Sequence, residues 1–189
     1  MSLLPSPLSP PPCSEEFQIG RTALVPGLLK SLHCNRSGRI AEGLRLFEVS
    51  DVMLLDGGAD VGARNERRLA LLYAGATAGL EVVHGMVDRV MQLLEIPARP
   101  YAWCAAGGGG GGGDEAASYG KHGMRYAVVG SDAVPSYFPG RGAEIVVERA
   151  GGAAPVVVGH LGILHPAVLK SFELTFPTSV AEINIEMFV

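Results

Sequence analysis

Two residues in the last third of the chain carry side chains that could do chemistry. Arg141 follows the tripeptide Phe138-Pro139-Gly140, and a guanidinium on a glycine turn can bind a phosphate through two parallel hydrogen bonds. His165 could act as a general base, but no Ser or Cys nucleophile with a supporting acid accompanies it. The structural alternatives are an ion pair with a nearby carboxylate for Arg141 and the capping of a helix that Pro166 begins for His165. We favour these alternatives and predict no catalytic residue.

The histidines and cysteines lack the close, paired spacing of metal sites. An odd number of cysteines also argues against a disulfide framework, so we expect reduced thiols and no metal site. The residues concerned are Cys13, Cys34, Cys104, His33, His84, His122 and His160.

Charge limits the role of nucleic acid. The formal net charge of -4 disfavours independent binding to phosphate-rich partners. A local basic edge could still contact a nucleic acid, although the interleaved Glu66 makes a solvated surface the better interpretation. The basic residues of this edge are Arg64, Arg67, Arg68, Lys121 and Arg125.

Two segments of low complexity flank or interrupt the periodic sequence. Residues 1–13 are rich in proline and serine, which predicts a disordered leader. Residues 104–123 contain seven consecutive glycines, Gly107 to Gly113, which predicts a flexible insertion within a core domain of residues 14–189. No run approaches the roughly 18 apolar residues of a membrane span, and the start lacks the basic region of a secretory signal. We expect a cytoplasmic protein with no membrane partner.

Hydrophobic periodicity predicts the elements that position these residues. Apolar residues recur at helical intervals in 79–96 and on one side of 26–38, and a short helix follows His165. Strands are expected at 44–55, 68–73, 126–130, 143–148 and 155–164, and at 181–189, where apolar and polar residues alternate to the end. Strands joined largely by hairpins and covered by helices give an α+β domain.

Several collinear blocks resemble one family. They are Arg21-Thr22-Ala23-Leu24-Val25-Pro26-Gly27-Leu28-Leu29-Lys30, Leu46-Phe47-Glu48-Val49, His84-Gly85-Met86-Val87-Asp88, Phe138-Pro139-Gly140-Arg141-Gly142, Gly159-His160-Leu161-Gly162 with His165-Pro166, and Ala181-Glu182-Ile183-Asn184. Together they are similar to the C-terminal, catalytic-like core of the beta subunit of phenylalanyl-tRNA synthetase, of the eukaryotic and archaeal cytosolic type.

The resemblance implies a class II aminoacyl-tRNA synthetase-like antiparallel sheet flanked by helices. It also implies assembly with an alpha subunit as alpha2beta2, in which the whole enzyme uses ATP and Mg to charge tRNA(Phe) with phenylalanine. The first class II motif of that family builds a subunit interface, and the matching residues here are Arg21, Thr22, Pro26, Gly27, Leu28 and Leu32. We therefore expect an interface there, since an apolar face of Leu28 and Leu32 would otherwise be left open.

The closing segment departs from a working class II site. Such a site places glycines and a phosphate-binding Arg there, whereas residues 180–186 contain neither Gly nor Arg and carry Glu182 and Glu186. Carboxylates would repel a nucleotide, so we expect this fragment alone to be inactive and to bind no cofactor itself.

Alternatives stay open at the level of sequence. Full beta subunits of the family also carry an editing domain and a domain with acidic magnesium ligands, and neither is present in these 189 residues. The chain could be a fragment or truncated gene product, or a free-standing interaction or tRNA-binding protein derived from this module.

Overall fold

A computed structural model describes residues 20–35, 40–99, 119–120 and 122–188. The described residues form a six-stranded sheet in the order β1-β2-β6-β5-β4-β3, with every neighbouring pair antiparallel. The strands are β1 (Leu44–Leu55), β2 (Ala63–Ala74), β3 (Met124–Gly130), β4 (Tyr137–Arg149), β5 (Val156–Leu164) and β6 (Thr178–Asn184). The helices are α1 (Val25–Cys34), α2 (Leu80–Leu93) and α3 (Pro166–Ser171), with two 3-10 turns, η2 (Ile40–Glu42) and η5 (Glu186–Phe188).

Hairpins build most of the sheet, and the last strand joins its two halves. β1 and β2 form one long hairpin, in register from Leu44 opposite Ala74 to Leu55 opposite Ala63. β3, β4 and β5 follow one another as a meander. β6 then pairs with β2 on one side and with β5 on the other, so it lies at the centre of the sheet.

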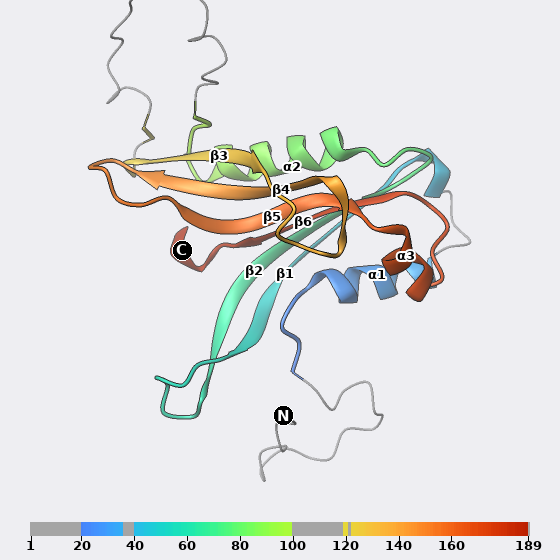
Figure 1. The fold of residues 1–189 in the computed structure, drawn as a ribbon, viewed down its shortest axis with the longest axis horizontal. Helices are drawn as coiled ribbons and strands as arrows, with labels where there is room; N and C mark the ends of the chain where they lie inside the picture. Colours follow the sequence, from blue (N-terminus) through green and yellow to red (C-terminus); the bar gives the residue numbers. More distant parts are fainter. Residues whose placement is uncertain (1–19, 36–39, 100–118, 121, 189) are drawn as a thin grey trace, which may run out of the picture.

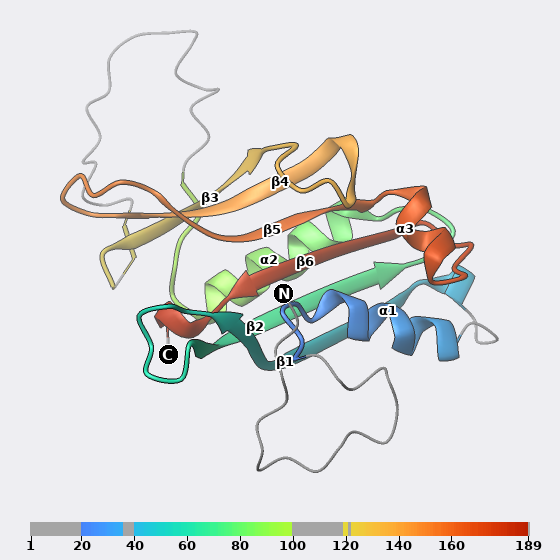
Figure 2. The same ribbon diagram turned by 60° about the horizontal axis from the view of Figure 1, so that its bottom comes forward.

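Helices cover both faces of the sheet. Figures 1 and 2 show α2 on one face, with α1 and α3 on the other. Val83, Val87 and Met91 recur along α2 at intervals of four and are fully buried against the sheet. Leu28, Leu29 and Leu32 do the same for α1 on the opposite face, where the second apolar cluster lies. The result is a helix–sheet–helix arrangement with a core on each side of the sheet.

The α+β class predicted from the sequence is confirmed, and several predicted boundaries are wrong, including the start of β4, which lies at Tyr137 rather than at residue 143. The last strand ends at Asn184, and the chain turns into η5, so Met187 and Phe188 do not continue the alternation. β2 begins at Ala63, five residues before the predicted start, because its polar first half is held by pairing with β1. Helix α1 ends at Cys34. The predicted leader (1–13) and most of the predicted glycine-rich insertion (104–123) lie outside the described residues.

Candidate functional site

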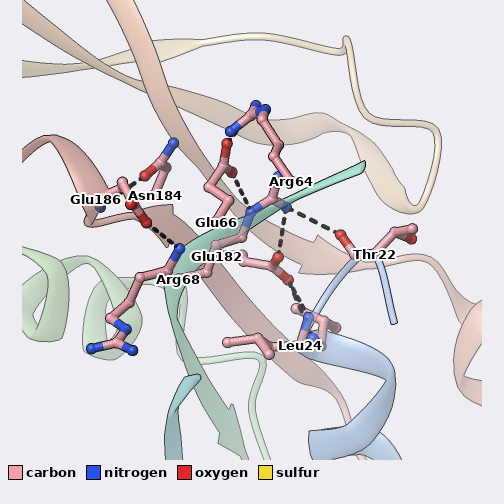
Figure 3. Close-up of polar contacts among 10 residues, drawn as sticks. Thr22, Leu24, Arg64, Glu66, Arg68, Glu182, Asn184 and Glu186 are labelled. Atoms are coloured by element: carbon pink, nitrogen blue, oxygen red, sulfur yellow. Dashed lines mark hydrogen bonds and ion pairs between the residues drawn. The ribbon is translucent and has the colours of Figure 1, made fainter. Parts of the chain in front are cut away.

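A cluster of carboxylates and guanidinium groups crosses β2 and β6 at the start of α1 (Figure 3). Glu182 accepts hydrogen bonds from the main-chain N–H groups of Leu24 and Val25 at 3.1 and 3.2 Å. Its other carboxylate oxygen, Oε1, accepts a hydrogen bond from Arg68 Nη1 at 2.9 Å. The carboxylate thus binds the first amides of a helix, where the positive end of the helix dipole favours a negative charge.

Arg68 lies between two carboxylates. Its Nε donates to Glu66 Oε1 at 2.8 Å, and Arg64 Nη2 lies 2.9 Å from Glu66 Oε2. The Glu66 side chain is only 6% exposed and that of Glu182 only 11%. Burial lowers the pKa of Arg68, but hydrogen bonds to Glu182 and Glu66 outweigh it and raise that pKa above its ordinary value. Every charge of this chain of ion pairs is therefore compensated by another.

A pocket of about 580 Å³ opens beside the cluster. Its walls come from α1, α3 and strands β2, β4, β5 and β6, and most of its lining is apolar, including Val25, Leu29 and Phe172. The charged groups that line it are Glu66, Glu182 and Arg68, with no other Lys or Arg among its described lining residues. Its carboxylates and guanidinium count as two negative charges against one positive, and Arg64, which pairs with Glu66, lies outside the lining. The volume suits a small molecule, but the charge disfavours phosphate.

Two further polar groups reach this pocket. Burial, followed by the nearby charge of Glu182, raises the pKa of the Tyr137 hydroxyl far above its ordinary value, so the phenol stays neutral. His160 lies opposite Glu182 across β5 and β6, and its Nδ1 is buried without a hydrogen-bond partner among the described residues. No nucleophile, base and acid come together here in the described structure.

The residues predicted to form an interface fall into two groups. Leu28 and Leu32 are 5% and 1% exposed, packed against the chain's own sheet, so the open apolar face expected from the sequence does not exist. Pro26 lies in the first turn of α1 and lines the pocket, and the carbonyl of Thr22 accepts a 3.4 Å hydrogen bond from Arg68. A subunit interface at α1 stays a prediction, but the burial of Leu28 and Leu32 no longer supports it.

Arg21 lies against the edge strand β1. Its Nη1 bonds Glu48 at 2.6 Å, its Nη2 bonds the Ser50 hydroxyl, and its Nε donates to the Asp51 carbonyl at 3.2 Å. Gly27 lies beside the same Glu48 carboxylate, since a Cβ there would be 3.6 Å from Oε2. These contacts fasten the segment before α1 to β1.

Phe138, Pro139, Gly140 and Arg141 lie within β4, in an irregular stretch between the paired residues Tyr137 and Gly142. Gly140 has a φ of 69°, which side chains disfavour, and its N–H donates to Asp132 at 2.7 Å. Arg141 is exposed and makes no ion pair with any described residue, so the ion pair predicted for it is not found. No buried polar side chain of the described residues lies beside Arg141 to help it bind a phosphate.

His165 caps α3, as predicted. Its Nδ1 accepts a hydrogen bond from the N–H of Ala167 at 3.1 Å, and Pro166 occupies the first turn. The ring also stacks on Phe138, with ring centroids 6.1 Å apart. Pro166 and His165 therefore have structural roles.

The basic edge expected from the sequence is solvated only in part, since Arg64 and Arg67 are exposed whereas Arg68 and Arg125 are partly buried. Arg67 pairs with Asp51 at 2.8 Å, and Arg125 pairs with Glu148 at 2.7 Å, while Glu66 itself is buried. Lys121 lies outside the described residues. The ion-pair cluster went unpredicted because Arg68 and Glu182 are 114 positions apart. The only available signal was Glu66 and Arg68, two positions apart and hence on the same face of a strand.

The described residues form neither a metal-binding group of side chains nor a membrane-spanning helix. They contain no group of three or more His, Cys, Asp or Glu side chains placed to hold a metal ion. None of the described helices has the length and apolar character needed to cross a membrane.

Comparison with known proteins identifies relatives across nearly the whole chain. Residues 10–185 match the family model described as phenylalanyl tRNA synthetase beta chain CLM domain. The phenylalanine–tRNA ligase beta subunit of Drosophila melanogaster is 45% identical over 94% of this chain and 26% of its own length. That of Mus musculus is 44% identical over 94% and 25%, and the subunit of Arabidopsis thaliana that is named cytoplasmic is 37% identical over 93% and 26%. The chain thus spans about a quarter of the length of these curated relatives.

Proposed function

Because the chain belongs to the phenylalanyl-tRNA synthetase beta chain CLM domain family, we propose that it is the catalytic-like but non-catalytic core module of a phenylalanine–tRNA ligase beta subunit. In this proposal the six-stranded antiparallel sheet has a class II synthetase-like fold. The module supports assembly with an alpha subunit, in the cytoplasm, for ATP- and Mg-dependent charging of tRNA(Phe) with phenylalanine.

The observation that carries the non-catalytic role is the charge of the pocket. A nucleotide site needs cations aimed at the phosphates. Here the only guanidinium among the described lining residues is Arg68, and it is already bound by Glu66 and Glu182. Glu182 also occupies the Leu24 and Val25 amides, which would otherwise be donors for an anion at the start of α1.

The test is phenylalanine-dependent exchange of pyrophosphate into ATP. We expect no exchange by the chain alone, and exchange at the usual rate by an active ligase assayed in parallel as the positive control. Measurable exchange by the purified chain would overturn the non-catalytic role.

Assembly is tested separately. The chain, co-expressed with the alpha subunit from the same organism, should co-purify with it. A chain that binds no alpha subunit would favour a free-standing role. A salt-dependent shift of tRNA by the isolated chain would instead favour a tRNA-binding module.

A further inference from the structure

The pocket beside the ion-pair cluster has a polar floor and apolar walls. The floor is the sheet face that α1 and α3 cover, and its polar side chains are those of Glu66, Arg68, His160, Glu182 and Asn184. Helix α1, helix α3 and the segment before β4 supply the walls, which include Leu29, Val134 and Val168. With a volume of about 580 Å³, the pocket has room for a small organic molecule whose polar end meets the floor.

The floor has hydrogen-bond acceptors that its own donors do not use. A carboxylate can accept about four hydrogen bonds. Glu182 accepts one from Arg68 and two from main-chain amides, whereas Glu66 accepts one from Arg68 and pairs with Arg64 (Figure 3). Because both carboxylates line the pocket, their remaining lone pairs favour a ligand group that only donates hydrogen bonds.

Tyr137 adds a hydroxyl that the chain leaves unused. The residue is 9% exposed and lines the pocket, and its hydroxyl makes no hydrogen bond with a described residue. Its ring lies over Gly162 of β5, since a Cβ there would be 2.7 Å from the ring carbons. Burial and then the charge of Glu182 raise the pKa of the hydroxyl, so it stays neutral in the field of a carboxylate. Such a hydroxyl can accept a hydrogen bond from a cationic donor.

The same geometry disfavours an anionic group on the ligand. Among the described lining residues, Arg68 is the only Lys or Arg, and two carboxylates already hold it. Glu182 also occupies the Leu24 and Val25 amides, the other donors that an anion could use near the start of α1. An ammonium group needs acceptors alone, and the floor provides them.

We propose that this pocket binds an apolar primary amine that carries no carboxylate, such as an arylalkylamine. Its ammonium group donates to Glu66, Glu182 and the Tyr137 hydroxyl, and its apolar body packs against Leu29, Val168 and the other wall residues. The site lies within this chain and needs no alpha subunit, so the inference goes beyond the proposed function and does not rest on it.

The first test titrates the chain with four probes that share a phenyl group: 2-phenylethylamine, 2-phenylethanol, 3-phenylpropionate and L-phenylalanine. NMR of valine methyl groups follows the binding. 2-Phenylethylamine should bind with a Kd of about 1 mM or tighter and shift the Val134 and Val168 methyls. Val87, which is buried on the α2 side of the sheet, should not shift and is the internal control. The other three probes should bind at least about tenfold more weakly, because each lacks the ammonium or adds a carboxylate.

A pair of Tyr to Phe substitutions supplies the second test. Tyr137→Phe keeps the ring and removes only the hydroxyl, so it should weaken the binding of 2-phenylethylamine by about threefold to tenfold. Tyr126→Phe is the matched control, because the Tyr126 hydroxyl bonds Asp88 of α2 and does not line the pocket. Its Kd should be unchanged, and thermal melts show whether both variants fold.

Several outcomes would overturn the proposal. They are the absence of a saturable shift at Val134 and Val168, shifts confined to residues outside the pocket, and an unchanged Kd for a folded Tyr137→Phe. Binding of 3-phenylpropionate or L-phenylalanine as tight as that of 2-phenylethylamine would indicate an anion site instead. Equally tight binding of 2-phenylethanol would indicate an apolar site that needs no cation. None of these titrations involves an alpha subunit or pyrophosphate exchange, so a failure here is distinct from a failure of the proposed function.

Discussion

Glu182 Oε1 lies 2.9 Å from Arg68 Nη1, so a carboxylate of the central strand β6 pairs with a guanidinium of the neighbouring β2. The same carboxylate holds the start of α1 through two amides. One side chain therefore joins two strands and a helix.

Glu182→Ala should lower the free energy of unfolding by about 2 to 3 kcal/mol, since it leaves buried donors without an acceptor. Urea denaturation measures the loss. Asp60→Ala, which removes an exposed carboxylate, should stay within about 0.5 kcal/mol of the unaltered chain. Equal effects of the two substitutions would show that the cluster contributes nothing beyond surface charge.

Gly159→Ala tests the packing at the middle of the sheet. A Cβ at Gly159 would lie 2.4 Å from the Glu182 carbonyl oxygen and 2.9 Å from the Ile183 Cα, both of which are backbone atoms of β6. We expect a loss of about 1 to 3 kcal/mol from overpacking, seen as a lower urea midpoint. Gly130→Ala is the control, because no atom lies within 4 Å of its Cβ. An unchanged midpoint for Gly159→Ala would mean that β5 and β6 can separate without cost.

His165→Ala removes the side-chain cap of α3. The expected loss is about 1 kcal/mol, because the Ala167 N–H loses its acceptor. His165→Asn should recover most of the stability, since an Asn oxygen can accept the same hydrogen bond. If both variants lose equally, stacking on Phe138 matters more than the cap.

Glu148 should make stability fall in acid. The hydrogen bond from Arg125, followed by that from Arg99, lowers the pKa of Glu148 below its ordinary value of 4.5. Because this pKa is lowered in the folded state, the ionised Glu148 stabilises the fold fully above pH 4.5. That stabilisation is lost as the pH falls through the folded-state pKa. Glu148→Gln should therefore lower the Tm at neutral pH and flatten its decline between about pH 5 and pH 3. A decline as steep as that of the unaltered chain would assign the acid sensitivity to other groups.

The sequence was most informative where periodicity and packing agree. The repeat of Val83, Val87 and Met91 predicted α2 because these residues must share one buried face. The alternation of apolar and polar residues predicted a strand over 181–189. Ile185 and Met187 continue that pattern, but the strand ends at Asn184. There the Asn184 side chain accepts a hydrogen bond from the Glu186 N–H and turns the backbone, an effect that hydrophobic patterning does not record.

The site was harder to predict, for a physical reason. His165 was assigned correctly because capping depends on the adjacent Pro166 and Ala167. The Glu66, Arg68 and Glu182 cluster depends on which strands become neighbours, and that order is set by the whole sheet. The helix that buries Leu28 and Leu32 was predicted correctly. The argument that their apolar face needs a partner subunit was wrong, because distant strands of the same chain cover it.

The central place of β6 has a consequence for biosynthesis. β1 with β2, and β3 to β5, are each complete before residues 178–184 are made, yet no strand pairing joins these two parts until β6 enters between them. A ribosome therefore presents two sheet fragments with open edges until the last strand is released. Such edges are prone to aggregation, so the nascent chain should need chaperone protection longest at residues 68–74 and 159–163, which pair with β6 in the finished sheet.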